Sequence, residues 1–221
     1  MSHSPRRIAA FDFDGTLTRR DTLGGFLVHV GGRPAVATAL LAESTGLAQG
    51  LRNDAKRDAA KERVLGRILR GRDEAALVAA GVEYAAVLPR RFRPDIAERV
   101  AWHHALGHEL VIVSASLVYY LRPVAESLGF DHVIGVEMEV DGTGRLTGAL
   151  TSQNVRAAEK ERRLRAWIAD TDSLDTGQPD PSRPVTGHEL WAYGNSSGDD
   201  ELLAMSDHPI WVGKRSSRKG A

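Results

Sequence analysis

Residues 9–18 read AAFDFDGTLT and place two carboxylates, Asp12 and Asp14, at the end of an apolar run. The alternation over residues 8–13 predicts a buried strand that Gly15 ends. Residues two apart in a strand point to the same face, so the two acids would be neighbours whose charges repel. A pair of turn-forming acids at a strand end is the structural alternative. Flanking apolar residues and the hydroxyl of Thr16 favour a functional pair instead.

The composition excludes several classes of function. The chain has 221 residues, 29 basic and 29 acidic side chains, and no cysteine. Because the charges cancel, we expect no nucleic-acid partner. Without cysteine there is no disulfide, thiolate nucleophile or cysteine-bound zinc, so a metal would be held by oxygen or imidazole. The apolar runs are shorter than the roughly 18 residues of a membrane span, and we expect a soluble cytoplasmic protein without one.

The hydrophobic pattern divides the chain into a helical block and an alternating region. Residues 21–88 read as helices punctuated at Gly31–Pro34, Gly46 and Gly71. Beyond residue 93 strands and helices alternate, which favours right-handed crossovers and a parallel sheet. Strands are expected at 109–114, 132–136, 190–193 and 210–212, helices at 97–105, 117–128, 157–169 and 199–205, a hairpin at 140–150 and a loop at 170–187.

The economical fold is therefore α/β, a parallel Rossmann-like sheet core with a small helical-bundle cap inserted after the first strand. The core would comprise residues 1–18 and 93–212, and the cap residues 19–92. The basic tail at 213–221 is expected to be disordered. Ligands of such sheets bind at the carboxyl ends of the strands.

Two acids at a strand end suit phosphoryl transfer. One carboxylate can attack phosphorus and form an aspartyl-phosphate, while the other delivers a proton to the leaving oxygen. A divalent cation beside Asp12 would favour its anionic form. Since such transfer depends on positioning and charge stabilisation, a hydroxyl donor, a cation and a further metal ligand should follow in the chain.

The sequence resembles the haloacid dehalogenase-like superfamily of phosphatases. DFDGTLT resembles its first signature, DxDxT, and three further signatures follow in order over nearly the whole chain: Ser114 ends VIVS, Lys160 stands in AAEKERRL, and WAYGNSSGDDELL is an acidic loop after a strand. Taken alone, Ser114 could cap the following helix, and Lys160 could lie on a solvated helix face. Ser116 is a competing choice for the second signature, but Ser114 is the residue directly at the strand end.

The resemblance implies a role for each of these residues. Asp12 would be the nucleophile, Asp14 the general acid and then base, and Ser114 and Lys160 the phosphate-binding residues. Thr16 is a further substrate-binding candidate.

The resemblance also implies Mg²⁺ as cofactor. It would be held by the Asp12 side chain, the Asp14 backbone carbonyl and the first residue of the acidic loop. The family commonly has Gly-Asp at this point, whereas this chain has Gly194-Asn195, so a neutral amide replaces a carboxylate. We therefore expect weaker magnesium binding unless Asp199 or Asp200 approaches the ion.

The insert position resembles the phosphoserine-phosphatase-like branch, in which an acid shortly after the first signature often contacts substrate. Asp21 has that position, although it could equally cap a helix. Basic residues gather between 52 and 67, and one or two of them could meet an acidic group of the substrate. A solvated helix face is the alternative for that run.

We therefore expect a magnesium-dependent phosphatase that hydrolyses a small phosphorylated metabolite through an aspartyl-phosphate. A phosphotransferase would share every signature. A lysophospholipid-type phosphatase is a further alternative, against which the absence of a membrane segment weighs mildly. A catalytically weak binding or regulatory protein on the same fold is the alternative from a different class, and Asn195 is the feature that suggests it.

Overall fold

The sheet at the centre of the molecule is parallel, as expected. The computed structural model describes residues 5–50, 53–176 and 187–213. Its five-stranded sheet has the order β3-β2-β1-β6-β7 with every pairing parallel. The strands are β1 (Arg6–Phe11), β2 (Glu109–Leu117), β3 (His132–Val136), β6 (His188–Gly194) and β7 (His208–Trp211). The α/β, Rossmann-like fold class is thus confirmed.

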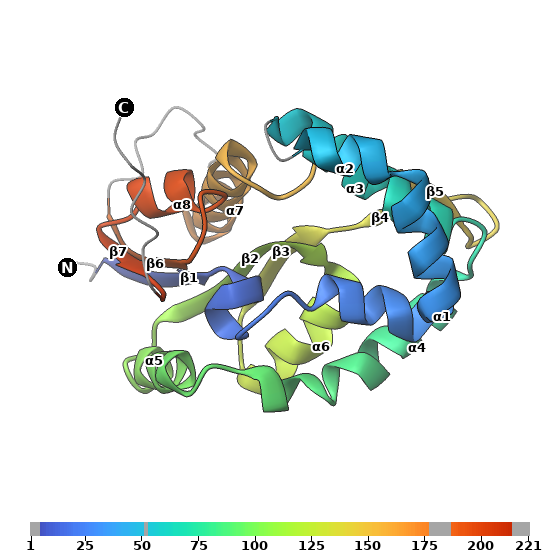
Figure 1. Ribbon diagram of the computed structural model, residues 1–221. Helices are drawn as coiled ribbons and strands as arrows, with labels where there is room; N and C mark the ends of the chain where they lie inside the picture. The colour runs from blue at the N-terminus through green and yellow to red at the C-terminus, as the bar shows by residue number, and fades with distance from the viewer. Residues whose placement is uncertain (1–4, 51–52, 177–186, 214–221) are drawn as a thin grey trace.

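Helices cover both faces of the sheet, which explains why β1 and β2 are almost continuously apolar. In Figure 1, α5 (Pro94–Ala105) and α6 (Val118–Leu128) lie below the sheet, and α7 (Ala158–Thr176) and α8 (Asp200–Ala204) lie above it. Residues from Ile8 to Phe11 are completely buried. The carboxyl ends of β1, β2 and β6 consequently meet over a solid apolar core.

Between β1 and α5 the described chain forms four α-helices: α1 (Leu23–Ala42), α2 (Ser44–Gly50), α3 (Asp54–Leu69) and α4 (Glu74–Ala85). Side chains cap the N-termini of α3 and α4, because Asn53 accepts a hydrogen bond from the Lys56 amide and Asp73 accepts one from the Ala76 amide. In Figure 1 these helices stand to the right of the sheet, beyond the ends of its strands. The helical pattern expected between residues 21 and 88 is present.

α1 bends at the punctuation expected from Gly31–Pro34. Gly32 has φ +78° and ψ 158°, so the helical backbone is interrupted there. By length and composition alone α1 is apolar enough to cross a membrane, with a mean hydropathy of 1.3 over its most apolar window. The bend leaves two short helical segments, each too short to span the roughly 30 Å of a bilayer core.

A hairpin and α6 fasten the four helices to the core. The hairpin consists of β4 (Met138–Val140) and β5 (Leu146–Leu150). The amide of Gly71 donates to the carbonyl of Leu146 (2.8 Å), so the α3–α4 connection continues the edge of the hairpin. Gly81 of α4 packs directly on α6, where an added Cβ would stand 2.0 Å from the carbonyl oxygen of Tyr119.

The expected ends of α7 and β2 were wrong. α7 continues past residue 169 to Thr176, so the loop expected at 170–187 begins later. The remainder of that loop, at 177–186, lies outside the described residues, as does the expected disordered tail beyond Gly213. β2 runs on to Leu117 instead of ending at Ser114, because the backbone stays extended as far as α6.

Candidate active site

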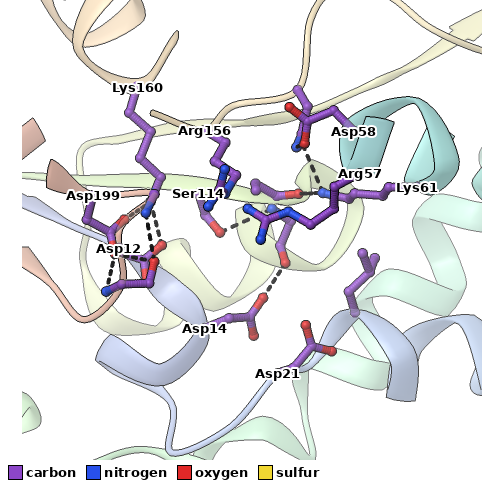
Figure 2. A pocket seen from close by; sticks show the side chains of 16 residues that line it. Asp12, Asp14, Asp21, Arg57, Asp58, Lys61, Ser114, Arg156, Lys160 and Asp199 are labelled. Carbon is purple, nitrogen blue, oxygen red and sulfur yellow. Dashed lines mark hydrogen bonds and ion pairs between the residues drawn. The ribbon is translucent and has the colours of Figure 1, made fainter. Parts of the chain in front are cut away.

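Residues from four separate segments meet where β1, β2 and β6 end. Asp12 follows β1, Ser114 lies near the end of β2, Asn195 follows β6, and Lys160 comes from the first turn of α7. Asp12, Ser114 and Lys160 line a cavity of about 240 Å³ together with residues of α3, and Asn195 lies behind Asp12. Figure 2 shows Asp12, Asp14 and Ser114 on the core side and Arg57 and Lys61 reaching in from α3.

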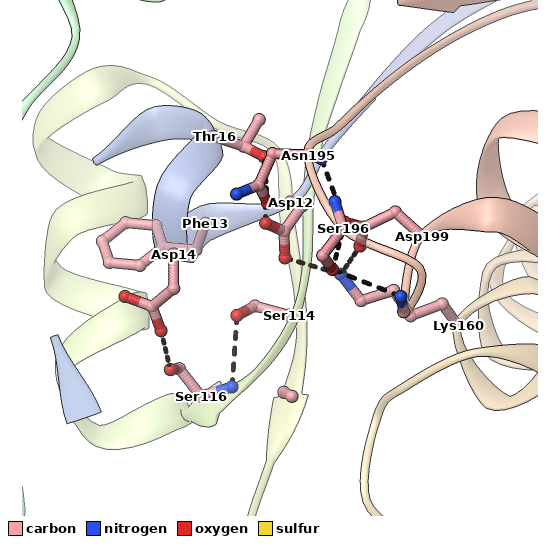
Figure 3. Close-up of polar contacts among 12 residues, drawn as sticks. Asp12, Phe13, Asp14, Thr16, Ser114, Ser116, Lys160, Asn195, Ser196 and Asp199 are labelled. Atoms are coloured by element: carbon pink, nitrogen blue, oxygen red, sulfur yellow. Dashed lines mark hydrogen bonds and ion pairs between the residues drawn. The ribbon is translucent and has the colours of Figure 1, made fainter. Parts of the chain in front are cut away.

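Lys160 is held between two carboxylates. Its Nζ lies 2.6 Å from Asp12 Oδ1 and 2.6 Å from Asp199 Oδ1, and the three side chains are 3%, 9% and 1% exposed. Asp199 is fixed in turn, because its Oδ2 accepts from the amides of Asn195 (3.1 Å) and Ser196 (2.9 Å). The lysine thus points back from α7 to the strand ends, as Figure 3 shows.

The ion-pair network decides the charge of these groups. Burial raises the pKa of Asp12 to about 6 because the attraction of Lys160 offsets it only in part. Burial also opposes the charge of Lys160, but Asp12 and Asp199 outweigh it and raise the lysine's pKa. For Asp199 burial is outweighed by Lys160 and by two backbone amides, so its pKa is lowered. The raised pKa of Asp12 favours a neutral carboxyl group, whereas the raised pKa of Lys160 favours a charged lysine that faces an ionised carboxylate. The short contacts of Lys160 to two acids favour the charged lysine with both acids ionised above about pH 6.

Asp14 is surrounded by hydrogen-bond donors. Oδ1 accepts from the Thr22 amide (2.7 Å) and the Thr22 hydroxyl (2.6 Å), and Oδ2 accepts from the Ser116 hydroxyl. The hydroxyl of Tyr120 lies 3.1 Å from the Thr22 hydroxyl. Burial, followed by the charge of Asp21, raises the pKa of Asp14, while the donors from Ser116 and Thr22 oppose that rise. The raised pKa of Asp14 favours retention of its proton beside the cavity.

Asp12 directly precedes the turn η1 (Phe13–Leu17), and Asp14 is its second residue. Gly15 has φ +86°, and a Cβ there would stand 2.1 Å from the amide nitrogen of Asn195, so glycine allows β6 to end against the turn. The Thr16 hydroxyl donates to Asp12 Oδ2 at 3.0 Å and lies 3.2 Å from Asn195 Oδ1. Thr16 is completely buried, so the structure places this candidate behind Asp12 and not on the cavity wall.

Three oxygen atoms converge beside Asp12 in a way that suits a hard cation. The end of the Asn195 amide that faces the pair lies 3.3 Å from Asp12 Oδ2 and 3.2 Å from the carbonyl oxygen of Asp14. With the amide nitrogen there, Asn195 would donate to both; with the oxygen there, three acceptors face one another. Ligands about 2.1 Å from an octahedral Mg²⁺ stand about 3.0 Å apart, so an Asn195 oxygen at that end fits as the neighbour of each of the other two oxygens around one ion.

This donor set contains only one side-chain carboxylate. Among the residues that the structure describes, no group of three or more His, Asp or Glu side chains could hold a metal ion. A site here would depend on the backbone carbonyl of Asp14 and the amide of Asn195. Asp199, the other expected ligand, has both oxygens engaged by Lys160 and backbone amides.

The structure bears on the structural alternatives for Ser114 and Asp21. The Ser114 hydroxyl accepts from the Ser116 amide (3.1 Å), and α6 begins without a side-chain cap, so Ser114 is not the cap of that helix. Asp21 both lines the cavity and accepts from the Gly24 amide at the start of α1 (3.1 Å). Its two alternative roles are compatible.

Several residues of the site carry no signal in the sequence. Thr22 and Asn154 are single polar residues whose importance appears only when segments 8 to 96 positions apart meet. Lys61 is one of the basic residues between 52 and 67, but only the structure shows that it donates to the Ala115 carbonyl. His103 and His108, whose Nδ1 atoms lie 2.8 Å apart, are not among the residues that line the cavity.

Comparisons with known proteins agree with this geometry. A sequence profile of the haloacid dehalogenase-like hydrolases matches residues 9–204. Protein CicA of Caulobacter vibrioides is 34% identical over 210 residues, which is 94% of this chain and 86% of that protein. A Bordetella pertussis protein of unknown function superposes with a TM-score of 0.72 at 23% identity, covering 91% of this chain and 87% of that one. A probable phosphoserine phosphatase from Vibrio cholerae superposes at 0.58 and 19% identity, covering 91% and 54%. The protein belongs to the haloacid dehalogenase-like hydrolase family.

Proposed function

We propose that the protein is a magnesium-dependent phosphomonoesterase that works through an aspartyl-phosphate on Asp12. The observation that carries this proposal is the position of the Asp12 carboxylate at the cavity, 2.6 Å from the ammonium of Lys160 and one short turn from Asp14. A lysine beside the nucleophile keeps it anionic and offers positive charge to an incoming phosphate.

In the first step Asp12 attacks phosphorus and the bond to the leaving oxygen breaks. Asp14 gives its proton to that oxygen, so the leaving group departs as a neutral alcohol. In the second step Asp14 takes a proton from water, which attacks phosphorus and releases inorganic phosphate and free Asp12. The hydroxyl of Ser114 and the ammonium of Lys160 bind the phosphate oxygens in both steps.

Magnesium would be held by Asp12, the Asp14 carbonyl and Asn195. When bound, the ion supplies positive charge that offsets the charge of Asp12 and the phosphate. Asn195 contributes no charge of its own, so binding should be weaker than at a site with a second carboxylate. Asp199 is better suited to fix Lys160 than to bind the ion, since its oxygens already accept from the lysine and the acidic loop.

The substrate proposed for this cavity is a small phosphorylated metabolite. About 240 Å³ accommodates a phosphate and a few more heavy atoms. The part of the cavity away from Lys160 is lined by Arg57 and Lys61 and by Asp21 and Asp58, so it presents both signs of charge. That lining and the likeness to a probable phosphoserine phosphatase favour a polar, charged leaving group. We propose that residues 19–92 act as a cap over the core, and that this cap supplies the charged part of the cavity lining.

Hydrolysis of p-nitrophenyl phosphate tests the proposal. The purified protein should release p-nitrophenolate with Mg²⁺, lose that activity after chelation, and regain it when Mg²⁺ is restored. Asp12→Asn should abolish turnover. The matched control is Asp95→Asn, because Asp95 is an exposed acid on α5 that pairs with Arg93. Activity that survives in Asp12→Asn, or a parent protein inactive at every Mg²⁺ concentration, would overturn the proposed function.

A further inference from the structure

The three residues Ser114, Ala115 and Ser116 join the phosphate-binding end of β2 to the acid Asp14. The Ser116 amide donates to the Ser114 hydroxyl, and the Ser116 hydroxyl donates to Asp14 Oδ2. Ser116 is only 2% exposed, and its side chain points to Asp14 in Figure 3. With Thr22 on Oδ1, this hydroxyl fixes the rotation of the carboxyl group about its bond to the chain.

The same segment is gripped from the other side by α3. Lys61 donates to the Ala115 carbonyl oxygen and to Asn154 Oδ1 (2.9 Å), and Asn154 in turn donates to Asp58 Oδ1 (2.7 Å). Figure 2 shows the Lys61 side chain reaching from α3 into the cavity. Burial lowers the pKa of Lys61 to about 8, so most of it is charged near neutral pH. Hydrogen bonds from a charged donor are among the stronger ones in proteins.

We propose that Ser116 is a positioning residue for Asp14, and that Lys61 couples it to the cap through the Ala115 carbonyl. The inference rests on the proposed function, because it concerns the acid that protonates the leaving oxygen. Each carboxyl oxygen has two lone pairs. Ser116 can therefore occupy one lone pair of Oδ2 and leave the other for the proton that is passed to the leaving group.

Dependence on the leaving group distinguishes this role from a structural one. p-Nitrophenolate needs little protonation to depart, whereas the phenolate of phenyl phosphate is more basic and needs an acid. Both esters share the second step, so kcat/KM, which reports only the steps up to departure of the leaving group, is the quantity to compare. Ser116→Ala should lower kcat/KM for phenyl phosphate by about tenfold to hundredfold, a part of the usual contribution of a general acid. It should change kcat/KM for p-nitrophenyl phosphate less than about threefold.

Ser127→Ala is the matched control, because Ser127 on α6 also donates one hydrogen bond, to the Val124 carbonyl (2.8 Å), away from the cavity. It should leave both esters unaffected. Thermal unfolding followed by circular dichroism shows whether each variant is folded at the assay temperature. An active parent whose Ser116→Ala variant slows both esters equally, or neither, overturns this inference alone. A parent inactive on both esters overturns the proposed function and this inference with it.

The link to the cap is tested by Lys61→Met and by the double variant. If Lys61 acts through Ser116, Lys61→Met should also slow phenyl phosphate selectively, and the double variant should lose about as much as the worse single variant. Lys56→Met is the control on the same helix, since Lys56 is exposed and its Nζ donates a hydrogen bond to Gln49 Oε1. Losses that multiply in the double variant show that Lys61 acts independently of Ser116 and overturn the coupling.

Discussion

Asp199→Asn is the substitution that most directly tests the buried ion-pair network. The new amide oxygen would best replace Oδ2, which accepts from the Ser196 amide at 2.9 Å and from the Asn195 amide at 3.1 Å. The amide nitrogen would then face the ammonium of Lys160 at the position of Oδ1, now 2.6 Å from Nζ. Rotating the amide restores that contact only by losing the two backbone hydrogen bonds.

The cost follows from burial. Asp199 and Lys160 are 1% and 3% exposed, and removing one partner of a buried pair costs about 3–5 kcal/mol because it leaves a charge uncompensated. Asp12 still faces Lys160, so the lower end of that range applies, about 3 kcal/mol. The lysine should then be drawn wholly to Asp12, and turnover of p-nitrophenyl phosphate should fall as well.

Urea unfolding followed by circular dichroism measures this loss, with Glu161→Gln as the comparison. Glu161 pairs with Arg165 at 2.9 Å, but the two side chains are 32% and 46% exposed. Removing that pair should cost only about 0.3–0.5 kcal/mol. A loss below about 1 kcal/mol in Asp199→Asn lies within the range of exposed ion pairs. That result would refute the assignment of a tightly paired, charged Lys160.

Three further outcomes follow from the structure. Burial, and next the neighbouring His108, lowers the pKa of His103 to about 4, so its folded form resists protonation. The contribution of His103 to the free energy of unfolding is present above its unfolded pKa of about 6.5. It is lost as pH falls, by about 2 kcal/mol between about pH 7.5 and about pH 5. Urea unfolding at both pH values should show His103→Phe losing less stability over that interval than the parent; equal losses would contradict this. Asn195→Asp should tighten Mg²⁺ binding about tenfold in titration calorimetry, because it adds a charge to the donor set; unchanged affinity would count against Asn195 as a ligand. Gly81→Ala should cost about 1–3 kcal/mol in thermal unfolding, because its Cβ would meet the Tyr119 carbonyl at 2.0 Å. Gly142→Ala, with nothing within 4 Å, is its neutral control.

Much of the site could be predicted from the sequence because its residues stand next to strand ends. Asp12, Ser114 and Asn195 each follow or end an apolar run, and adjacent parallel strands bring such positions together. Lys160 was predictable from order and resemblance. Its exact partners were not, since Asp199 and Asp12 are 39 and 148 residues away and no local pattern encodes those contacts.

The remaining polar network is a tertiary property. Ser116 donates to an acid 102 residues earlier, and Lys61 to a carbonyl 54 residues later. In the sequence they read as an alternative to Ser114 and as one member of a basic run. The helix boundary at Thr176 escaped prediction because a polar, acidic stretch continues α7 without the apolar periodicity that marks helices. In contrast, the bend at Gly32 was marked by glycine and proline.

The central claim is a covalent phosphoryl group on Asp12. The parent protein can be quenched during turnover of p-nitrophenyl phosphate with borohydride, which reduces an acyl phosphate to an alcohol. Peptide mass spectrometry then reports the residue at position 12. Conversion of Asp12 to homoserine, absent when substrate is omitted, is the predicted result. An unmodified Asp12 in protein that is turning over substrate, or reduction at a different carboxylate, would contradict the account.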